Sequence, residues 1–68
     1  MRIKYNLTPG EKLTVVEDLM EEPRKRRCTV VKEYRLFVVV DYGLYRGTID
    51  KRKCECLEMK FWKGWSEE

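Results

Sequence analysis

The sequence of 68 residues predicts an all-β protein, a small five-stranded antiparallel barrel with a one-turn helix before the last strand. Val, Ile, Thr, Tyr and Phe dominate residues 28–49, and these side chains suit a pleated, half-buried surface. Turn signals divide this stretch twice, at a Tyr-Arg corner (34–35) and an Asp-Tyr-Gly turn (41–43), and no helical period runs through it. We therefore expect an antiparallel meander in the middle of the chain.

The remaining elements follow from local patterns. Residues 1–7 alternate apolar and polar side chains and predict an extended arm, which the Thr-Pro-Gly-Glu turn at 8–11 ends. Alternation of the same kind predicts the five strands, over residues 12–19, 24–34, 35–41, 44–49 and 55–62. A helix over residues 11–22 is the alternative for the first strand, but its β-branched run and the preceding Pro-Gly favour a strand.

Three finer expectations concern the second half of the chain. Both faces of the strand over 35–41 are apolar, so we expect it to be central or covered on both sides. Gly47 predicts a bend or bulge in the strand over 44–49. Asp50 is expected to cap a helical turn over 50–54, with Lys51, Arg52 and Lys53 on its exposed side. Residues 63–68 are expected to form a loose tail.

Length and composition narrow the classes of function. A chain of 68 residues forms one domain, and at this size it buries only about 60% of the surface of its unfolded form. No apolar run approaches the roughly 20 residues of a membrane span, and no signal-peptide pattern opens the chain. The three cysteines are an odd number, which is unusual for a small disulfide-bonded secreted protein. We expect a cytoplasmic protein with no membrane partner.

Motifs for catalysis are missing from the sequence. It has no histidine, no nucleophile elbow and no phosphate-binding glycine loop. Cys28, Cys54 and Cys56 would need a fourth ligand, such as Glu55 or Glu58, to hold zinc. We therefore expect reduced, packed cysteines and a binding module, not an enzyme, with no cofactor, no metal and no small-molecule substrate.

The charge is distributed unevenly along the chain. Residues 1–23 carry three basic and five acidic side chains, whereas residues 24–65 carry twelve basic and five acidic ones. Such polarity favours a polyanionic partner, although solvated Lys and Arg also keep small β-proteins soluble. The first functional hypothesis is therefore nucleic-acid binding through a basic rim. The expected rim consists of Arg24, Lys25, Arg26, Arg27, Tyr45, Arg46, Lys51, Arg52 and Lys53.

Two tryptophans near the C-terminus support a second hypothesis. Trp62 and Trp65 are large for so small a core, and exposed Trp side chains often anchor protein interfaces. The alternative function is thus a protein adaptor or a homodimer that uses these two residues. If both tryptophans are instead part of the packing, one indole closes the open end of the barrel and the other lies against it.

The order of elements resembles that of SH3-like small barrels. The Thr-Pro-Gly-Glu-Lys-Leu opening at 8–13 is similar to the entry of many such barrels, including KOW-type ones. Residues 28–54, with Cys28-Thr29-Val30-Val31, Tyr34, Phe37-Val38-Val39-Val40, Gly43, Tyr45-Arg46 and Ile49-Asp50-Lys51, resemble short uncharacterised proteins of phages and mobile elements of Gram-positive, largely Firmicute, bacteria. In those proteins the corner usually reads Tyr-Pro-aromatic-Phe, whereas this chain has Arg35 and Leu36 there. The resemblance implies a fold and a genetic context, and no established activity.

Overall fold

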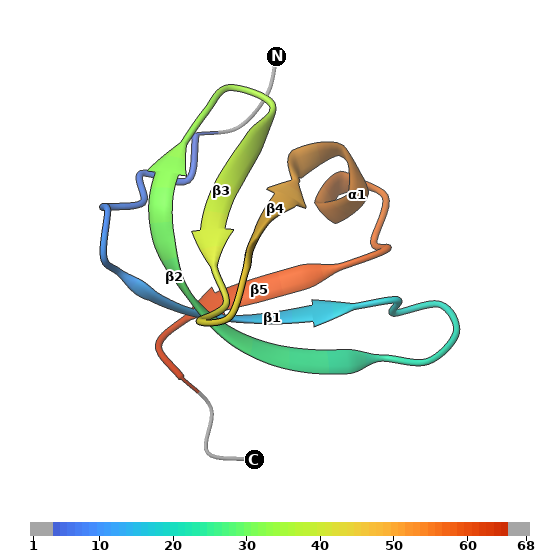
Figure 1. The fold of residues 1–68 in the computed structure, drawn as a ribbon. Helices are drawn as coiled ribbons and strands as arrows, with labels where there is room; N and C mark the ends of the chain where they lie inside the picture. Colours follow the sequence, from blue (N-terminus) through green and yellow to red (C-terminus); the bar gives the residue numbers. More distant parts are fainter. Residues whose placement is uncertain (1–3, 66–68) are drawn as a thin grey trace.

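The computed structural model describes residues 4–65, which form five antiparallel strands and one helical turn (Figure 1). The strands are β1 (Lys12–Glu17), β2 (Arg24–Glu33), β3 (Phe37–Asp41), β4 (Arg46–Asp50) and β5 (Lys60–Lys63). The helical turn α1 (Lys51–Glu55) connects β4 to β5. The predicted all-β fold, with a one-turn helix before the last strand, is confirmed.

The strand order in the sheet is β4-β3-β2-β1-β5. The long strand β2 pairs with β1 from Arg24 to Thr29 and with β3 from Thr29 to Glu33. A register shift between Val30 and Lys32 interrupts the ladder with β3, and such irregularities bend a strand. Figure 1 shows β2 curving through the molecule, so that the sheet folds back on itself. The hydrogen-bonded ladder nevertheless has two edges, β4 and β5.

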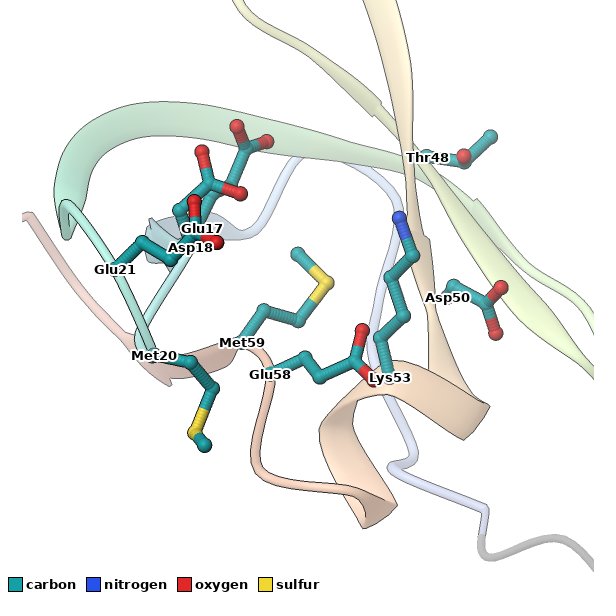
Figure 2. A pocket seen from close by; sticks show the side chains of 9 residues that line it. All are labelled: Glu17, Asp18, Met20, Glu21, Thr48, Asp50, Lys53, Glu58 and Met59. Atoms are coloured by element: carbon teal, nitrogen blue, oxygen red, sulfur yellow. The ribbon is translucent and has the colours of Figure 1, made fainter.

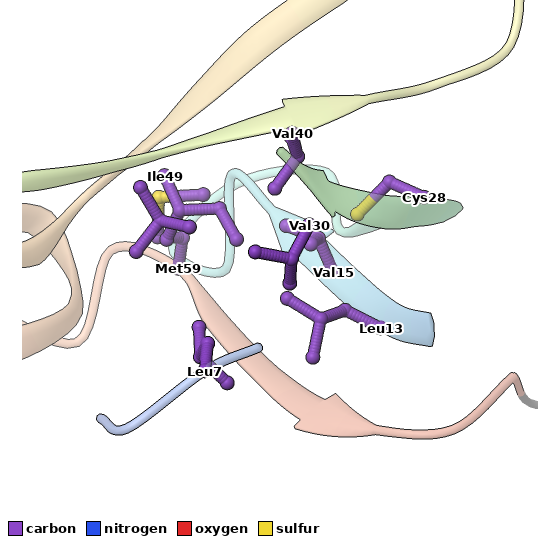
Figure 3. Packing of buried hydrophobic residues seen from close by; sticks show 9 residues of the cluster. Leu7, Leu13, Val15, Cys28, Val30, Val40, Ile49 and Met59 are labelled. Atoms are coloured by element: carbon purple, nitrogen blue, oxygen red, sulfur yellow. The ribbon is translucent and has the colours of Figure 1, made fainter. Parts of the chain in front are cut away.

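The core lies inside this fold and receives buried side chains from β1, β2, β3 and β4, from the N-terminal arm and from the segment just before β5 (Figure 3). Strict alternation puts Leu13 and Val15 of β1 on the inner face, where they are completely buried. Tyr5, Tyr42, Cys54 and Phe61 pack around this cluster. The buried members are Leu7, Leu13, Val15, Cys28, Val30, Val38, Val40, Ile49 and Met59.

Several predicted strand boundaries were wrong because turns intervene. β1 ends at Glu17 instead of residue 19, since Asp18 has a φ of 55° and begins a turn. β3 begins at Phe37, and the corner before it leaves Leu36 exposed. The predicted strand over 55–62 fails in its first half: α1 ends at Glu55, and Leu57 has a φ of 61°. Residues 56–59 form a loop in which apolar and polar side chains alternate as they would in a strand. Only Lys60–Lys63 joins the sheet.

Gly47 does not interrupt the ladder, contrary to the predicted bend or bulge. It pairs in register with Val40, and β4 runs regularly from Arg46 to Asp50. The glycine instead makes room for an aromatic ring. A Cβ at this position would lie 2.6 Å from Cε2 of Tyr42, which is closer than side chains can approach.

The expected cap of α1 is confirmed, but the expected exposure of its first residue is wrong. The carboxylate of Asp50 accepts a hydrogen bond from the Arg52 N–H, at 2.8 Å. Lys51 is only 1% exposed, because its ammonium points inwards to Glu33. Arg52 and Lys53 are exposed as predicted.

The described part of the N-terminal arm, residues 4–7, is fastened to the same glutamate. The Tyr5 and Leu7 N–H groups donate to the two carboxylate oxygens of Glu33, at 2.6 and 3.0 Å. Leu7 enters the core, so the arm belongs to the folded structure. Residues 1–3 of the arm and 66–68 of the predicted tail lie outside the described residues.

Candidate functional site

The outer surface of β5, β1 and β2 gathers cationic side chains around an indole. Strand pairing places Lys25 of β2 and Lys60 of β5 on either side of Val16, in one row across the sheet. The next row places Arg27 and Trp62 on either side of Thr14. Because Leu13 and Val15 point into the core, these rows lie on the opposite, outer face. We call this surface the basic face, made up of Lys12, Lys25, Arg27, Lys60 and Trp62.

The side chains that make up the basic face are all exposed, while the β1 residues between them are buried. Thr14 is completely buried and Val16 is 7% exposed. The short central side chains are therefore covered, and the long side chains on either side of them reach solvent. None of the strand positions on this face carries a carboxylate, so its charged strand residues are all cations.

Trp65 lies beside the basic face, and the loose tail predicted from residue 63 is wrong for residues 63–65, because Lys63 ends β5 and the next two residues are hydrogen-bonded to the sheet. Its Nε1–H donates to the Cys28 carbonyl at 2.9 Å. Lys12 Nζ lies 4.8 Å from the centre of this indole and Arg27 Cζ lies 5.9 Å from it, so the ring holds two cations of the face by cation–π attraction. The preceding residue, Gly64, donates its N–H to the Lys12 carbonyl and accepts from Thr14 Oγ1, at 2.8 and 2.7 Å.

Trp62 has a different environment. Its ring is 38% exposed and has Lys60 Nζ at 5.9 Å from its centre. Within residues 4–65, no hydrogen bond engages its indole nitrogen. The sequence placed Trp62 and Trp65 in one hypothesis. The structure leaves both partly exposed, Trp65 at 43%, but within residues 4–65 only the Trp65 indole nitrogen has a hydrogen-bond partner.

The predicted basic rim is divided between two surfaces. Lys25 and Arg27 belong to the basic face, but Arg24 and Arg26 alternate to the other face of β2. Arg26 donates to the Tyr45 hydroxyl, and its Nε lies 3.8 Å from Glu17 Oε1. Arg26 and Tyr45 therefore bind each other beside the β3–β4 turn.

Of the other predicted rim residues, Lys51 is wrongly assigned because it is buried. Arg46 is exposed at the start of β4, opposite Asp41 in the ladder. Lys53 lines a groove of about 590 Å³ between the β1–β2 turn, β4 and the segment before β5 (Figure 2). Residues 51–53 therefore do not form part of the basic face.

The groove is acidic, which opposes the binding of phosphate. Its single cation among the described lining residues is Lys53, and Met59 is buried beneath it. Its carboxylates are those of Glu17, Asp18, Glu21, Asp50 and Glu58. The carboxylates of the groove therefore disfavour a polyanion there, and the cations of the basic face lie on a different surface.

The cysteines do not come together as a metal site. Burial, and then the nearby Glu17 carboxylate, raise the pKa of the Cys28 thiol to about 11. Burial also raises the pKa of Cys54, which is half-buried, whereas Cys56 is exposed. Residues 4–65 contain no cluster of three or more His, Cys, Asp or Glu side chains that could hold a metal ion. No helix in this part of the chain is long and apolar enough to cross a bilayer.

Sequence reasoning missed Lys12 and Lys60, which are isolated in the sequence and become neighbours of Lys25, Arg27 and Trp62 only through pairing. The sequence did contain one signal for them, because each lysine alternates with apolar residues and is therefore expected on the outer face of its strand. Comparisons with family models, with curated proteins and with solved structures found no match to this chain. The functional argument therefore starts from the basic face itself.

Proposed function

We propose that the protein binds nucleic acid through the basic face. The observation that carries the proposal is the set of four exposed cations that β5, β1 and β2 place around Trp62 with no carboxylate among the strand positions. Lys and Arg at such spacing neutralise phosphates and release counterions, which is the main source of affinity for nucleic acid. A cytoplasmic location and a phage or mobile-element context, expected from the sequence, fit such a partner.

The site differs from the rim that the sequence suggested, because only Lys25 and Arg27 of that rim contribute to it. Lys12 and Lys60 complete the cationic set. Trp62 supplies an exposed aromatic surface between the charges, a combination that nucleic-acid-binding sheet faces use.

The test compares the salt dependence of two matched charge reversals. Binding of a fluorescein-labelled 12-nucleotide thymidine strand is followed by anisotropy between 25 and 200 mM salt. The wild-type affinity should fall about 60- to 500-fold over this range, because three to four phosphate contacts give a log–log slope of about −2 to −3. The double variant Lys25→Glu with Lys60→Glu should bind at least tenfold more weakly at low salt.

The control is Arg52→Glu with Lys53→Glu, which changes the same number of charges on α1. Once the general effect of its lower net charge is taken into account, the affinity of this variant for the labelled strand should lie within about threefold of the wild-type affinity. Absence of binding at 25 mM salt, or equal loss in the two double variants, would overturn the proposal. Urea titration of both variants verifies that each is folded.

The sequence-based alternative is a protein adaptor or homodimer that uses Trp62 and Trp65. Trp65 is committed to the Cys28 carbonyl and to Lys12 and Arg27, which weakens its role as an anchor for a partner. Salt-insensitive self-association, measured by sedimentation of the wild type and abolished by Trp62→Ala, would support this alternative against the nucleic-acid proposal.

A further inference from the structure

We infer that the nucleic acid is single-stranded and that one of its bases stacks on Trp62, an inference that rests on the proposed function of the basic face. The first observation is the contrast between the two indoles. Trp65 has a hydrogen bond to Cys28 and two cations against its ring. Both tryptophans are partly exposed, Trp62 at 38% and Trp65 at 43%, but the indole nitrogen of Trp62 has no hydrogen-bond partner within residues 4–65.

The second observation is the position of Trp62 among the charges. It lies in the same row as Arg27, and Lys60 precedes it by two residues on the same face of β5. A base placed on this ring would therefore have cations near its phosphates on two sides. Stacking of a base on an aromatic ring and neutralisation of its phosphate can then occur together.

The shape of the face favours a single strand over a duplex. Three adjacent strands form it, and their backbones alone span roughly 10 Å before the long side chains are added. The major groove of B-DNA is only about 12 Å wide and admits a helix or a two-stranded ribbon. A duplex could therefore meet this surface through its phosphates, but its bases, stacked on one another, would not reach Trp62.

The distribution of the cations further supports an extended ligand. Lys25 and Lys60 lie in one row across the sheet, and Arg27 and Trp62 lie in the next. A flexible strand can cross both rows, with its phosphates towards Lys25, Arg27 and Lys60. Both single-stranded DNA and single-stranded RNA have the required bases and phosphates.

The experiment compares four ligands at 25 mM salt: a 12-nucleotide thymidine strand, a uridine strand, an abasic strand of equal length and a 12-base-pair duplex. At least one of the two base-containing single strands should bind about 5- to 150-fold more tightly than the abasic strand, which is the range for one stacked base. The tighter of the two identifies the sugar that the site prefers. Trp62→Ala should abolish this advantage, whereas Trp62→Phe should retain part of it.

The control is Tyr34→Ala, which removes an exposed aromatic ring at the β2–β3 turn, away from the basic face. It should preserve the difference between base-containing and abasic strands. Fluorescence of Trp62 in a Trp65→Phe background should be quenched by the base-containing strand that binds.

Two results would overturn the inference while leaving the proposed function intact. One is equal, salt-dependent affinity for the abasic strand or the duplex and for the base-containing strands. The other is an unchanged preference for bases in Trp62→Ala. Failure of all four ligands to bind at low salt would instead reject nucleic-acid binding itself.

Discussion

Lys51 Nζ lies 2.7 Å from Oε2 of Glu33, and both side chains are almost completely enclosed. The same carboxylate accepts the N–H groups of Tyr5 and Leu7. The Lys51 ammonium also lies 4.8 Å from the centre of the Tyr5 ring. One glutamate near the end of β2 therefore holds the N-terminal arm and the first residue of α1 together.

Lys51→Met should destabilise the protein by about 3–5 kcal/mol, because it leaves the Glu33 carboxylate buried without its cation. Lys53→Met, two residues along the helix at an exposed position, should change the free energy of unfolding by about 0.5 kcal/mol or less. Urea unfolding followed by tryptophan fluorescence measures both.

The double variant Lys51→Met with Glu33→Gln keeps this test informative where Lys51→Met alone fails to fold. It removes both charges and leaves an amide oxygen for the arm, so it should recover most of the lost stability. A Lys51→Met protein as stable as the wild type would contradict the role assigned to the pair.

Glu33 should also make stability depend on pH in the acidic range. Burial opposes ionisation of Glu33, but hydrogen bonds from Leu7, Lys51 and Tyr5 and the charge of Lys51 outweigh it and lower its pKa from 4.5 to about 2. A lowered carboxyl pKa stabilises the folded state at pH values above the unfolded pKa, and this contribution is lost as the pH falls from about 4.5 towards 2.

Between pH 6 and pH 3 the loss attributable to Glu33 should be about 2 kcal/mol. It is obtained from urea titrations as the difference between the wild type and the Glu33→Gln, Lys51→Met variant, which cancels the other carboxylates. Parallel pH profiles for the two proteins would show that Glu33 is not responsible.

Gly47→Ala should cost about 1–3 kcal/mol, because the new methyl group would meet the ring of Tyr42. That ring cannot withdraw without loss, since its hydroxyl donates to Glu17 at 3.3 Å and its face lies against Tyr45. In a Tyr42→Ala background the same substitution should be nearly neutral. An equal cost in both backgrounds would assign the effect to the backbone of β4.

Trp65→Phe should lower the free energy of unfolding by about 1 kcal/mol, because the Cys28 carbonyl loses its indole donor while much of the apolar contact is kept. The comparison variant Trp62→Phe removes no hydrogen bond within residues 4–65 and should change stability less. Chemical denaturation of the two variants measures how much each substitution lowers the free energy of unfolding. A larger loss in Trp62→Phe would reverse the roles given to the indoles.

The sequence predicted those elements whose signals are local. Alternation in β1 gave the inward positions of Leu13 and Val15, and Asp50 gave the start of α1. Alternation also misled at residues 55–59, where exposed Leu57 mimics a strand position but lies in a turn with a positive φ.

The candidate site depends on relationships that local patterns do not contain. Lys51 looks like an exposed helical cation until its partner, Glu33, is known to lie beside it. Lys12 and Lys60 are each solitary cations in the sequence, and the register of β1 with β2 and β5 brings them to Lys25 and Arg27. Such long-range pairing follows from tertiary structure.

The shared strand β2 makes the two halves of the sheet inseparable. Its first residues complete the layer with β1 and β5, and its last residues complete the layer with β3 and β4. A fragment that ends before Arg24 or begins after Glu33 lacks the common strand on which either layer depends. Neither half should therefore fold without β2, and hydrogen exchange should report one cooperative opening for the central amides on both sides of the bend.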